Sequence, residues 1–542
     1  MVLFDMNQKL NNVKENIITF DVFDTLVIRN VVRPIDVFDM VGGKHFRYTR
    51  IIAELVARKI SKNEDVTLDE IYHFLPKKFK EKEIAIEKDI CKPNPPIYEI
   101  YKNFKVQGKK IYAISDMYLP KDVISEILKN CGYELDGIYV SSEVGLTKST
   151  GNMFKYFLSK ENLLPNDVLH IGDNKHADGE GSSIAGIRSV IISKDKNMLT
   201  YLNKTSDIAL KGFVNHGINK IIDREEQIGY EVLGPIIVAF CQWIHNRYLE
   251  FEFNKLFFLS RDMHIVFDIY KKIYANDNIE YMYVSRKSLH SALNNDDGLR
   301  NYLKSIDFKG NIAVIDTGWR CAAQPILEYY ARKNVDTTNV GGLYFGVKTG
   351  YRYINRCSKS SACFYSSKLD MIKSQTYSSL IESFLGYNEN KVIGYKADGT
   401  PVFNIEKKNN ECMAKIQKGA IIFAENWLIE KGNASISTKD IIKAYKEIQD
   451  RPLLSDINII GDSEYDDVET TKIVSYEKTG NIKKWLNNLR FSAWKGAYFK
   501  KSFKCYTPFY YGYLVLDSIY LSYLDKKVFY GKNTEDLLLY YK

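Results

Sequence analysis

Four short polar segments in the first 190 residues could together bind a divalent cation and a phosphate ester. They contain Asp21, Ser115, Lys148 and the pair Asp173 and Asp178. A phosphate ester carries about two negative charges at neutral pH, so a carboxylate can attack it only if those charges are neutralised. A hard cation such as Mg²⁺ takes oxygen ligands and keeps several waters, so one or two carboxylates suffice. Asp21 and Asp173 meet this need, with Asp178 as an outer or additional ligand. Lys148 would oppose the developing transition-state charge, and Ser115 could donate a hydrogen bond to a phosphoryl oxygen.

Each polar segment follows an apolar, strand-like run of residues. The runs are residues 17–20, 110–114, 137–140 and 167–171. In open α/β sheets, ligand sites form at the carboxyl ends of parallel strands. The four segments therefore predict one pocket at the edge of a parallel α/β sheet.

The order of these segments resembles the haloacid dehalogenase (HAD) superfamily, most of whose members are Mg²⁺-dependent phosphatases. The resemblance covers residues 15 to 195 and rests on Phe20-Asp21-Val22-Phe23-Asp24-Thr25-Leu26, Ser115-Asp116, Lys148 and Gly172-Asp173-Asn174 with Asp178. It implies a Rossmann-like parallel sheet, with Asp21 as nucleophile and the carbonyl of Phe23 as a metal ligand. We expect Thr25, Asp116 and Asn174, which belong to the same motifs, to contact the substrate.

The first motif departs from the phosphatase pattern at one position. Phosphatases of this superfamily carry a second Asp two residues after the nucleophile, where it protonates the leaving group, and here that residue is Phe23. Asp24 is the next acid, but adjacent side chains of a strand point to opposite faces, so only a turn in the loop would bring it inward. General acid catalysis contributes roughly 10²–10⁴-fold. An enzyme without it would be slow or restricted to good leaving groups.

About ninety residues between the first two motifs show helical periodicity. Thr67 and Glu70 make a capping box, the signature of a helix start. A helical insertion over about residues 32–95 resembles the small cap that closes over the site in this superfamily. Ordinary helical packing is the alternative interpretation.

The chain of 542 residues is too long for a single core, and three or four domains are expected. Its net charge of +9 suits anionic ligands, yet no nucleic-acid-binding module is visible. The eight cysteines form no Cys-x-x-Cys pair, which argues against a zinc ribbon. Scattered cysteines and a polar N-terminus without a signal-peptide core favour a cytoplasmic protein.

A second set of strand ends predicts a second Rossmann-like domain over residues 230–375, after a helical connector at 196–229. Apolar runs lead into Arg261 and Asp262, into Arg286, and into Asp316. Arginine forks suit phosphate or carboxylate recognition, so these loops could take a phosphorylated or nucleotide-sugar ligand. The alternative is ordinary loop chemistry, with Ser and Asp as helix caps and Arg as a solvated charge. The tandem arrangement resembles large bacterial proteins linked with surface-polysaccharide synthesis.

Residues 376–542 are expected to be mainly helical, with Glu382 as a candidate partner of the arginines. Residues 483–504 mix basic and aromatic side chains, a composition that can lie on an anionic membrane surface. A packed helix with lysines that reach out to solvent is the competing interpretation.

The sequence as a whole predicts a Mg²⁺-dependent phosphohydrolase for a small phosphorylated metabolite such as a sugar phosphate. One competing hypothesis is a glycosyl- or phospho-transferase whose chemistry lies in residues 230–350 and whose N-terminal domain is non-catalytic. The other is a binding or scaffold protein that lost turnover with Phe23.

Overall fold

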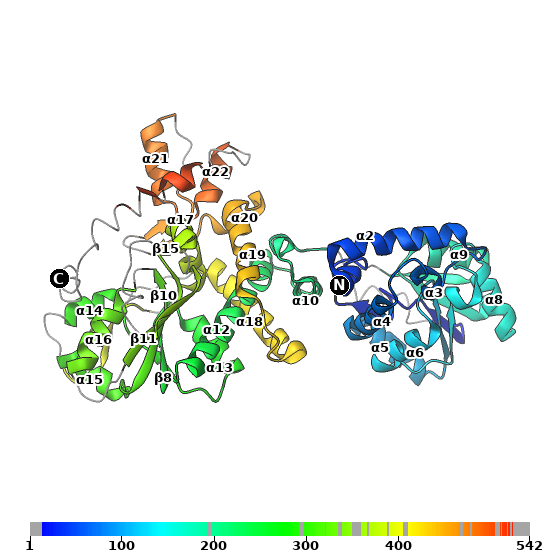
Figure 1. Cartoon of the computed structure of the whole chain (residues 1–542), viewed down its shortest axis with the longest axis horizontal. Coiled ribbons are helices and arrows are strands. Elements are labelled where there is room, and N and C mark those ends of the chain that lie inside the picture. Colours follow the sequence, from blue (N-terminus) through cyan, green and yellow to red (C-terminus); the bar gives the residue numbers. More distant parts are fainter. Residues whose placement is uncertain are drawn as a thin grey trace. The chain divides into compact units, whose positions relative to one another are not determined.

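In the computed structural model, the chain divides into two compact units. The first unit comprises residues 1–198 and 207–219, and the second comprises residues 199–206 and 220–542. The structure describes residues 13–192, 197–292, 297–319, 321–333, 339–348, 359–365, 368–386, 390–404, 410–466, 470–476, 480–503, 510, 512–517, 519–520 and 523. Each unit contains its own five-stranded sheet (Figure 1).

The first unit is built on a parallel sheet with the strand order β5-β4-β1-β6-β7. The strands are β1 (Ile17–Phe20), β4 (Lys110–Ser115), β5 (Gly137–Val140), β6 (Val168–Gly172) and β7 (Arg188–Ile191). Alternate side chains enter two apolar clusters: Ile18 and Phe20 belong to one, whereas Ile17 belongs to the other. The sheet is therefore buried on both faces, which is why its strands are continuous apolar runs.

Six helices of the first unit follow its strands or connect them. They are α5 (Pro95–Val106), α6 (Lys121–Asn130), α7 (Ser141–Val144), α8 (Asn152–Glu161), α9 (Gly181–Ile184) and α10 (Ile208–Ile218). Phe104 of α5 and Ile124 of α6 pack in the first cluster, and Phe154 and Phe157 of α8 pack in the second.

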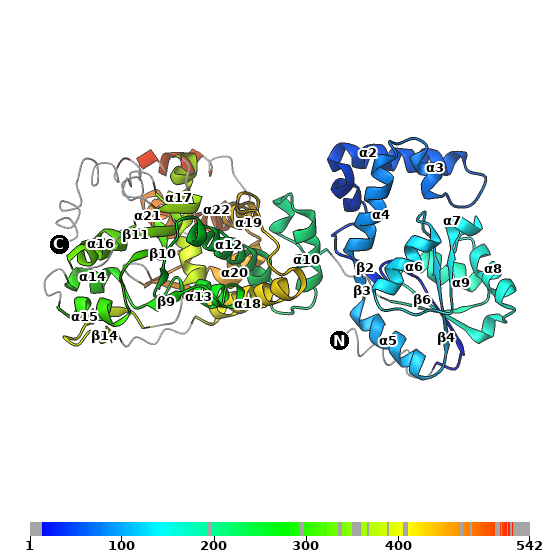
Figure 2. The ribbon, with the colours of Figure 1, turned by 60° about the horizontal axis from the view of Figure 1, so that its bottom comes forward.

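The helical insertion predicted after the first motif is present as α2 (Asp36–Ile60), α3 (Leu68–Tyr72) and α4 (Lys78–Ile90). It leaves and re-enters the sheet domain through the antiparallel pair β2 (Val27–Arg29) and β3 (Cys91–Pro93). Figure 2 shows the three helices together on one side of the sheet. The capping box is confirmed, because Thr67 accepts a hydrogen bond from the Glu70 N–H and Glu70 accepts one from the Thr67 N–H.

The predicted connector, residues 196–229, is not a separate element, because its parts belong to different units. Glu231 Oε1 accepts hydrogen bonds from the backbone N–H groups of Thr200, Tyr201 and Leu202 at 2.6–2.9 Å, which fixes residues 199–206 to the second unit. In contrast, Gly212 of α10 lies against the Asn30 carbonyl, and a Cβ there would come within 2.1 Å of that oxygen. Helix α10 therefore belongs to the first unit.

The second unit contains a second parallel sheet with the strand order β12-β11-β10-β8-β9. The strands are β8 (Lys255–Leu259), β9 (Ile279–Met282), β10 (Asn311–Trp319), β11 (Asn339–Val347) and β12 (Ser361–Tyr365). Strand β10 is longer than its apolar core suggests: it continues through Asp316, which pairs with Tyr344 of β11. Strand β12 was not predicted from the sequence.

Helices and two short hairpins surround this second sheet. The helices are α11 (Arg224–Ile228), α12 (Gly234–Glu250), α13 (His264–Ile273), α14 (Arg286–Ala292), α15 (Asp297–Ser305), α16 (Ala323–Lys333), α17 (Lys368–Leu385), α18 (Glu411–Lys431), α19 (Thr438–Asp450), α20 (Leu454–Ile460), α21 (Ile482–Phe491) and α22 (Lys495–Phe503). The hairpins are β13 (Val392–Tyr395) with β14 (Pro401–Phe403), and β15 (Glu464–Asp466) with β16 (Thr470–Lys472).

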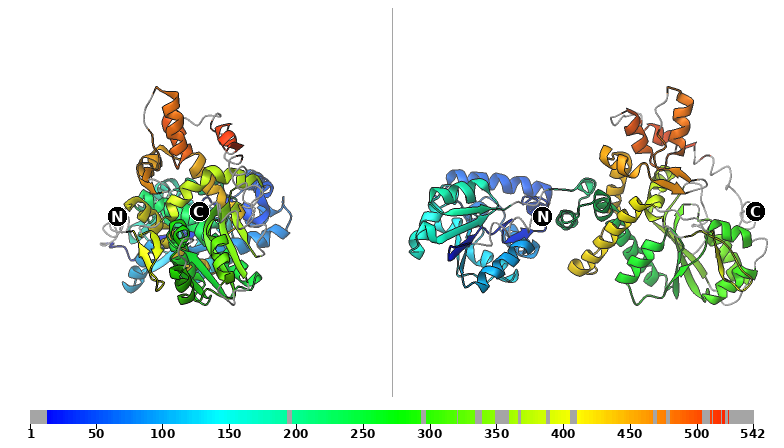
Figure 3. Two further views of the ribbon diagram at one scale, coloured as in Figure 1. Left: turned by 90° about the vertical axis from the view of Figure 1, so that its left-hand side faces the viewer. Right: turned by 180° about the vertical axis from the view of Figure 1, so that it is seen from behind.

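The helical region after residue 376 forms one compact unit with the second sheet. The Tyr445 hydroxyl of α19 donates to the Tyr377 carbonyl of α17, and Trp494 Nε1 donates to the Ile448 carbonyl at 3.1 Å. These buried polar links join segments that are far apart in the sequence. The orange and red helices α21 and α22 lie together at one end of this unit (Figure 3).

Two segments bear on membrane contact. Residues 224–250 form one helical stretch that is long and apolar enough to cross a membrane, with a mean hydropathy of 1.2, but 89% of its most apolar window is buried inside the protein. In the basic and aromatic segment 483–504, Trp494 and Tyr498 are fully buried. These two aromatic side chains thus contribute to the core, whereas Phe503 is exposed, and Lys504 lies outside the described residues.

Candidate active site

Two neighbouring strands of the first sheet, β1 and β6, lead into the carboxylates Asp21 and Asp173. Strands β4 and β5 lie on one side of β1 in the sheet, and strands β6 and β7 lie on the other. The strand order therefore reverses between β1 and β6. Ligands bind at such a switch point in open α/β sheets. Asp21 follows β1 and donates its backbone N–H to the Ile171 carbonyl of β6 at 2.9 Å, and Asp173 follows β6.

Asp21, Asp173 and Asp178 converge as the sequence predicted. One carboxylate oxygen from each lies within 4.8 Å of the others, a spacing that can hold a metal ion. An all-oxygen set of this kind suits a hard cation such as Mg²⁺. The three carboxylates therefore fit the cation that the sequence implied.

Lys148 lies between two of these carboxylates. Its Nζ donates to Asp21 and, at 2.6 Å, to Asp178 Oδ1, and the residue is only 2% exposed. Burial alone would lower the pKa of this lysine, but Asp21, Asp178 and Asp116 outweigh burial and raise its pKa. Lys148 is thus held as a cation. The pKa of Asp21 is raised above its usual value. Burial is the largest cause, Lys148 opposes the rise, and Asp178 adds to it.

Asp178 is held in place by its neighbours as well as by Lys148. Its Oδ1 lies 3.1 Å from His170 Nε2, and its Oδ2 accepts the Asn174 N–H at 2.9 Å. Burial would raise the pKa of Asp178, but Lys148 and His170 outweigh it and the net shift is downward. These contacts favour the ionised form of Asp178, which accepts the hydrogen bond that positions Lys148.

His170 is a site residue that the sequence did not single out. Its Nδ1 lies 2.9 Å from Thr19 Oγ1 of β1, so the ring joins β1 to Asp178 from inside the sheet. Burial is the main cause of its lowered pKa. A histidine within an otherwise apolar buried strand was the available signal, because a buried polar group needs a partner.

Gly172 explains how Asp178 can approach the strand so closely. A Cβ at this position would lie 2.2 Å from Asp178 Cγ and 2.3 Å from its Oδ2. Only glycine leaves room for the carboxylate there. Glycine is therefore required for steric reasons at the start of the segment Gly172-Asp173-Asn174, which is more than an ordinary turn.

The second motif supplies Ser115 and Asp116 at the end of β4. Ser115 is 1% exposed and lines the cavity described below. Both carboxylate oxygens of Asp116 accept the Lys148 backbone N–H at 3.0 Å. Burial raises the pKa of Asp116 to about 6, against the pull of Lys148. Asp116 thus fixes the backbone of the lysine loop, which is a positioning role.

A cavity of about 490 Å³ joins these motifs to the helical insertion. From the sheet side it is lined by Asp21, Phe23, Asp24, Arg29, Ser115, Asp116, Met117, Tyr118, Lys148, Asp173, Asn174, Ala177 and Asp178. From the insertion and its entry it is lined by Pro34, Ile35, Phe38, Ile51, Glu54, Leu55 and Glu87. Most of the wall contributed by the insertion is apolar, which is the composition expected for a cap that excludes water.

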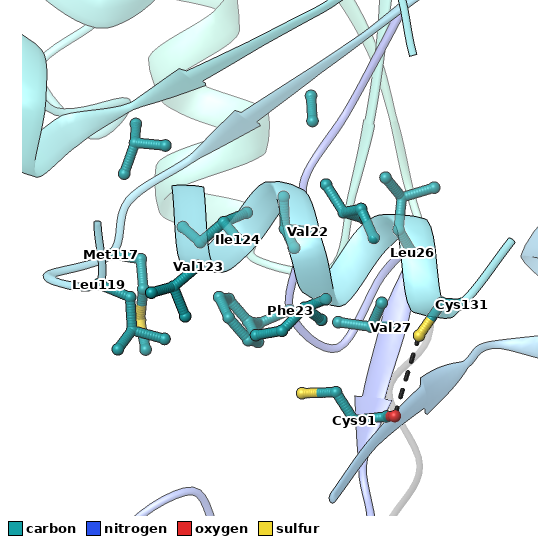
Figure 4. Packing of buried hydrophobic residues seen from close by; sticks show 14 of the residues in the cluster. Val22, Phe23, Leu26, Val27, Cys91, Met117, Leu119, Val123, Ile124 and Cys131 are labelled. Carbon is teal, nitrogen blue, oxygen red and sulfur yellow. Dashed lines mark hydrogen bonds between the residues drawn. The ribbon is translucent and has the colours of Figure 1, made fainter. Parts of the chain in front are cut away.

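Phe23 belongs to the apolar core beneath the cavity. It lies in the cluster that includes Val27, Met117 and Val123 (Figure 4) and is 8% exposed. The guanidinium carbon of Arg29 is 3.9 Å from the centre of its ring. Arg29 in turn donates to Glu87 Oε2 of α4 at 2.8 Å, so an ion pair links the insertion to the first motif.

Asp24 is turned by the loop and does not continue the strand. Its φ of 60° lies in the left-handed region, which Asp tolerates better than most residues. Asp24 is half-buried and lines the cavity. The strand alternation that would have pointed it away therefore does not apply here.

The structure brings most of the predicted site residues together. Thr25 is different: it is fully buried and is not among the residues that line the cavity. Its Oγ1 has no hydrogen-bond partner among the described residues, and its carbonyl accepts the Asn94 side chain at 2.9 Å. Arg261, Asp262, Arg286 and Asp316 belong to the second unit, at the carboxyl edge of its sheet.

Part of this chain is similar to known proteins. The family of haloacid dehalogenase-like hydrolases matches residues 16–186. Among curated proteins, none matches the sequence. Solved structures similar to this chain include a Bacteroides fragilis protein classed with the haloacid dehalogenase-like hydrolases, which is 23% identical, covers 32% of this chain and 86% of its own, and has a TM-score of 0.25.

Two further solved structures come from Bacillus and Xanthobacter. A HAD hydrolase from Bacillus subtilis bound to magnesium is 15% identical, covers 33% of this chain and 88% of its own, and has a TM-score of 0.26. The L-2-haloacid dehalogenase of Xanthobacter autotrophicus is 13% identical, covers 36% of this chain and 84% of its own, and has a TM-score of 0.27. Residues 16–186 are a haloacid dehalogenase-like hydrolase domain within a longer chain.

Proposed function

We propose that the first unit hydrolyses the phosphate ester of a small metabolite and uses Mg²⁺ to do so. The observation that carries this proposal is the convergence of Asp21, Asp173 and Asp178, with Lys148 hydrogen-bonded to two of them. Mg²⁺ would be held by Asp21, Asp173 and the Phe23 carbonyl, with Asp178 as an outer ligand. When bound, the cation would neutralise phosphoryl charge that Lys148 alone does not balance.

The side chains on the cavity wall account for both chemical steps. In the first step an oxygen of Asp21 attacks phosphorus, the ester P–O bond breaks, and an aspartyl-phosphate forms. Ser115 donates a hydrogen bond to a phosphoryl oxygen, and Lys148 stabilises the charge that develops there. Water then attacks the phosphorus of the aspartyl-phosphate, which releases phosphate and regenerates Asp21.

Asp24 is our candidate for the group that protonates the leaving oxygen. The position that normally carries this acid is filled by Phe23, but Asp24 lines the same cavity because its backbone is left-handed. With Asp24 in this role, the leaving group departs as an alcohol. Simple alkyl phosphates then become substrates, not only activated phosphates.

The size and lining of the cavity support a proposal for the substrate class. A volume of about 490 Å³ accommodates a small molecule. The wall supplied by the insertion offers Glu54 and Glu87 among apolar side chains. Both are paired with arginines, and the lone pairs that remain on their carboxylates can accept hydrogen bonds from sugar hydroxyls. We therefore favour a sugar phosphate. A role in bacterial surface-polysaccharide synthesis is supported only by the resemblance of the tandem arrangement, and a cytoplasmic location by the scattered cysteines.

The second candidate function is a transferase whose chemistry lies in residues 230–350. The observation in its favour is that the Arg29 guanidinium lies over the Phe23 ring. A cation is therefore found at the position where phosphatases of this superfamily carry the acid that protonates the leaving group. On this alternative the first unit binds a phosphorylated ligand without turnover.

A panel of phosphate esters tests both candidates. The full chain with Mg²⁺ is assayed against acetyl phosphate, sugar 1-phosphates and sugar 6-phosphates, together with Asp21→Asn, Asp24→Asn and the control Asp122→Asn. Asp122 is an exposed acid on α6 and does not line the cavity. We expect Asp21→Asn to abolish all turnover and Asp122→Asn to leave it unchanged.

Asp24→Asn separates the role of the acid from that of the site. We expect it to slow sugar 6-phosphates by roughly 10²-fold or more while acetyl phosphate, which needs no proton, changes little. Equal losses on both would remove Asp24 from the acid role. An absence of turnover with every compound, in a chain that still binds Mg²⁺, would favour the transferase.

A further inference from the structure

The second sheet has its own switch point, and charged residues flank it. Strand β9 lies on one side of β8 in the sheet, and strands β10, β11 and β12 lie on the other. The strand order therefore reverses between β8 and β10. Arg261 and Asp262 follow β8, and Asp316 lies near the carboxyl end of β10. Arg286 begins α14, after β9. This is the position where open α/β sheets bind ligands.

These four residues act on one another electrostatically. Arg261, Asp316 and Arg286 all influence the Asp262 carboxyl group, and the Thr317 side chain hydrogen-bonds to it. Asp316 interacts with Arg286 and with Glu382 of α17. The loops after β8 and β9 and the end of β10 therefore meet at one place.

The backbone at this edge is held in uncommon conformations. Arg261 has a φ of 72° although it is not glycine, and its N–H donates to the Tyr281 hydroxyl at 2.8 Å. Gly318 and Trp319, which follow Asp316 in β10, have φ values of 90° and 46°. Positive φ is strained at Arg261 and Trp319, which are not glycine, and such strain collects at ligand sites.

The two carboxylates lie in a desolvated place that still reaches solvent. Asp262 and Asp316 are half-buried and Arg286 is exposed. Burial is nevertheless the main cause that raises the pKa of each carboxyl to about 6. A charged group kept there costs stability, and functional sites commonly carry this cost.

The mixture of charges favours an anion with hydroxyl groups over a metal ion. Among the described residues, the only group of three acidic, histidine or cysteine side chains with metal-binding spacing is Asp21, Asp173 and Asp178. Arginine forks bind phosphate oxygens. Carboxylates such as Asp262 and Asp316 accept hydrogen bonds from hydroxyls.

We propose that the carboxyl edge of the second sheet is a ligand site of its own, which binds a phosphorylated small molecule that carries hydroxyl groups. Arg261 and Arg286 bind the phosphate, and Asp262 and Asp316 bind the hydroxyls. This site is independent of the hydrolysis proposed for the first unit.

Calorimetric titration of the full chain with inorganic pyrophosphate, in EDTA to prevent metal-dependent hydrolysis, tests the arginines. The test variant is Arg261→Asn with Arg286→Gln, because Asn tolerates the left-handed backbone and Arg286 is exposed. The control is Arg247→Gln, an arginine of the same unit on α12 that pairs with Glu250. Circular dichroism checks that each variant is folded.

We expect the double variant to weaken one pyrophosphate-binding event by roughly tenfold or more, while Arg247→Gln binds as the parent does. A folded double variant that binds pyrophosphate like the parent would overturn the proposal, as would a parent that binds none. In that case the charges form only a structural ion cluster. The phosphatase activity of the first unit should be the same in all three proteins.

Discussion

Arg29 lies over the ring of Phe23, with its guanidinium carbon 3.9 Å from the ring centre, and pairs with Glu87 of the helical insertion at 2.8 Å. The side chains of Arg29 and Glu87 are 7% and 1% exposed, so the pair is buried. The residue that replaces the usual acid therefore belongs to a contact between the sheet domain and the insertion.

This contact predicts the outcome of Phe23→Asp. A new carboxylate at this position would lie beside the Arg29 cation, which would lower the carboxyl pKa and keep it ionised. We expect no gain on sugar 6-phosphates in the steady-state rate, although the motif would then match the usual phosphatase pattern. A rate increase of tenfold or more would show that Arg29 does not control this position.

Mg²⁺ binding should depend on Asp173. We expect Asp173→Asn to weaken binding at least tenfold in calorimetric titration, because one of three converging carboxylates is lost. Glu180→Gln is the control, since its side chain is 70% exposed and pairs with His176. Equal Mg²⁺ affinity in Asp173→Asn and in the parent would show that Asp173 is not a ligand of the cation.

Two nearby glycines should respond differently to alanine. In Gly172→Ala the new Cβ would lie 2.2 Å from Asp178 Cγ, so Asp178 must move away from Lys148 and His170. Gly179→Ala meets only the tip of Ile191, at 3.5 Å. We expect kcat to fall by roughly 10²-fold in the first variant, in line with the loss of one transition-state contact, and to stay near the parent value in the second. Similar kcat values in both would remove Asp178 from the positioning role.

Stability of the second unit should depend on pH through Asp316. Its pKa is raised to about 6, chiefly by burial, so the folded state binds a proton more tightly than the unfolded state. This contribution is fully present below the ordinary Asp pKa and is lost as pH rises through about 6. We expect Asp316→Asn to raise the Tm of this unit more at pH 8 than at pH 4.5, as followed by scanning calorimetry. An equal shift at both pH values would contradict the assignment, with Asp262, Glu382 and the two arginines remaining as the groups that could compensate.

The sequence determined the elements and the motifs because both depend on local patterns. Apolar runs next to Asp21, Ser115 and Asp173 predicted buried parallel strands and one shared edge, and the structure has them there. The capping box at Thr67 and Glu70 involves residues three apart, so the helix start was also readable. The residues that converge on the candidate metal site followed from the order of the strands.

Tertiary structure decided what depends on contacts between distant residues or on backbone angles. The left-handed φ of Asp24 turns it to the cavity, although strand alternation points it away. His170 reads as one polar residue in an apolar strand until Thr19 and Asp178 are placed on either side of it. The division between the units follows from bonds such as those from Glu231 to residues 200–202, which join segments about 30 residues apart. Local sequence fixes strand ends, whereas the packing of separate segments fixes which side chains meet there.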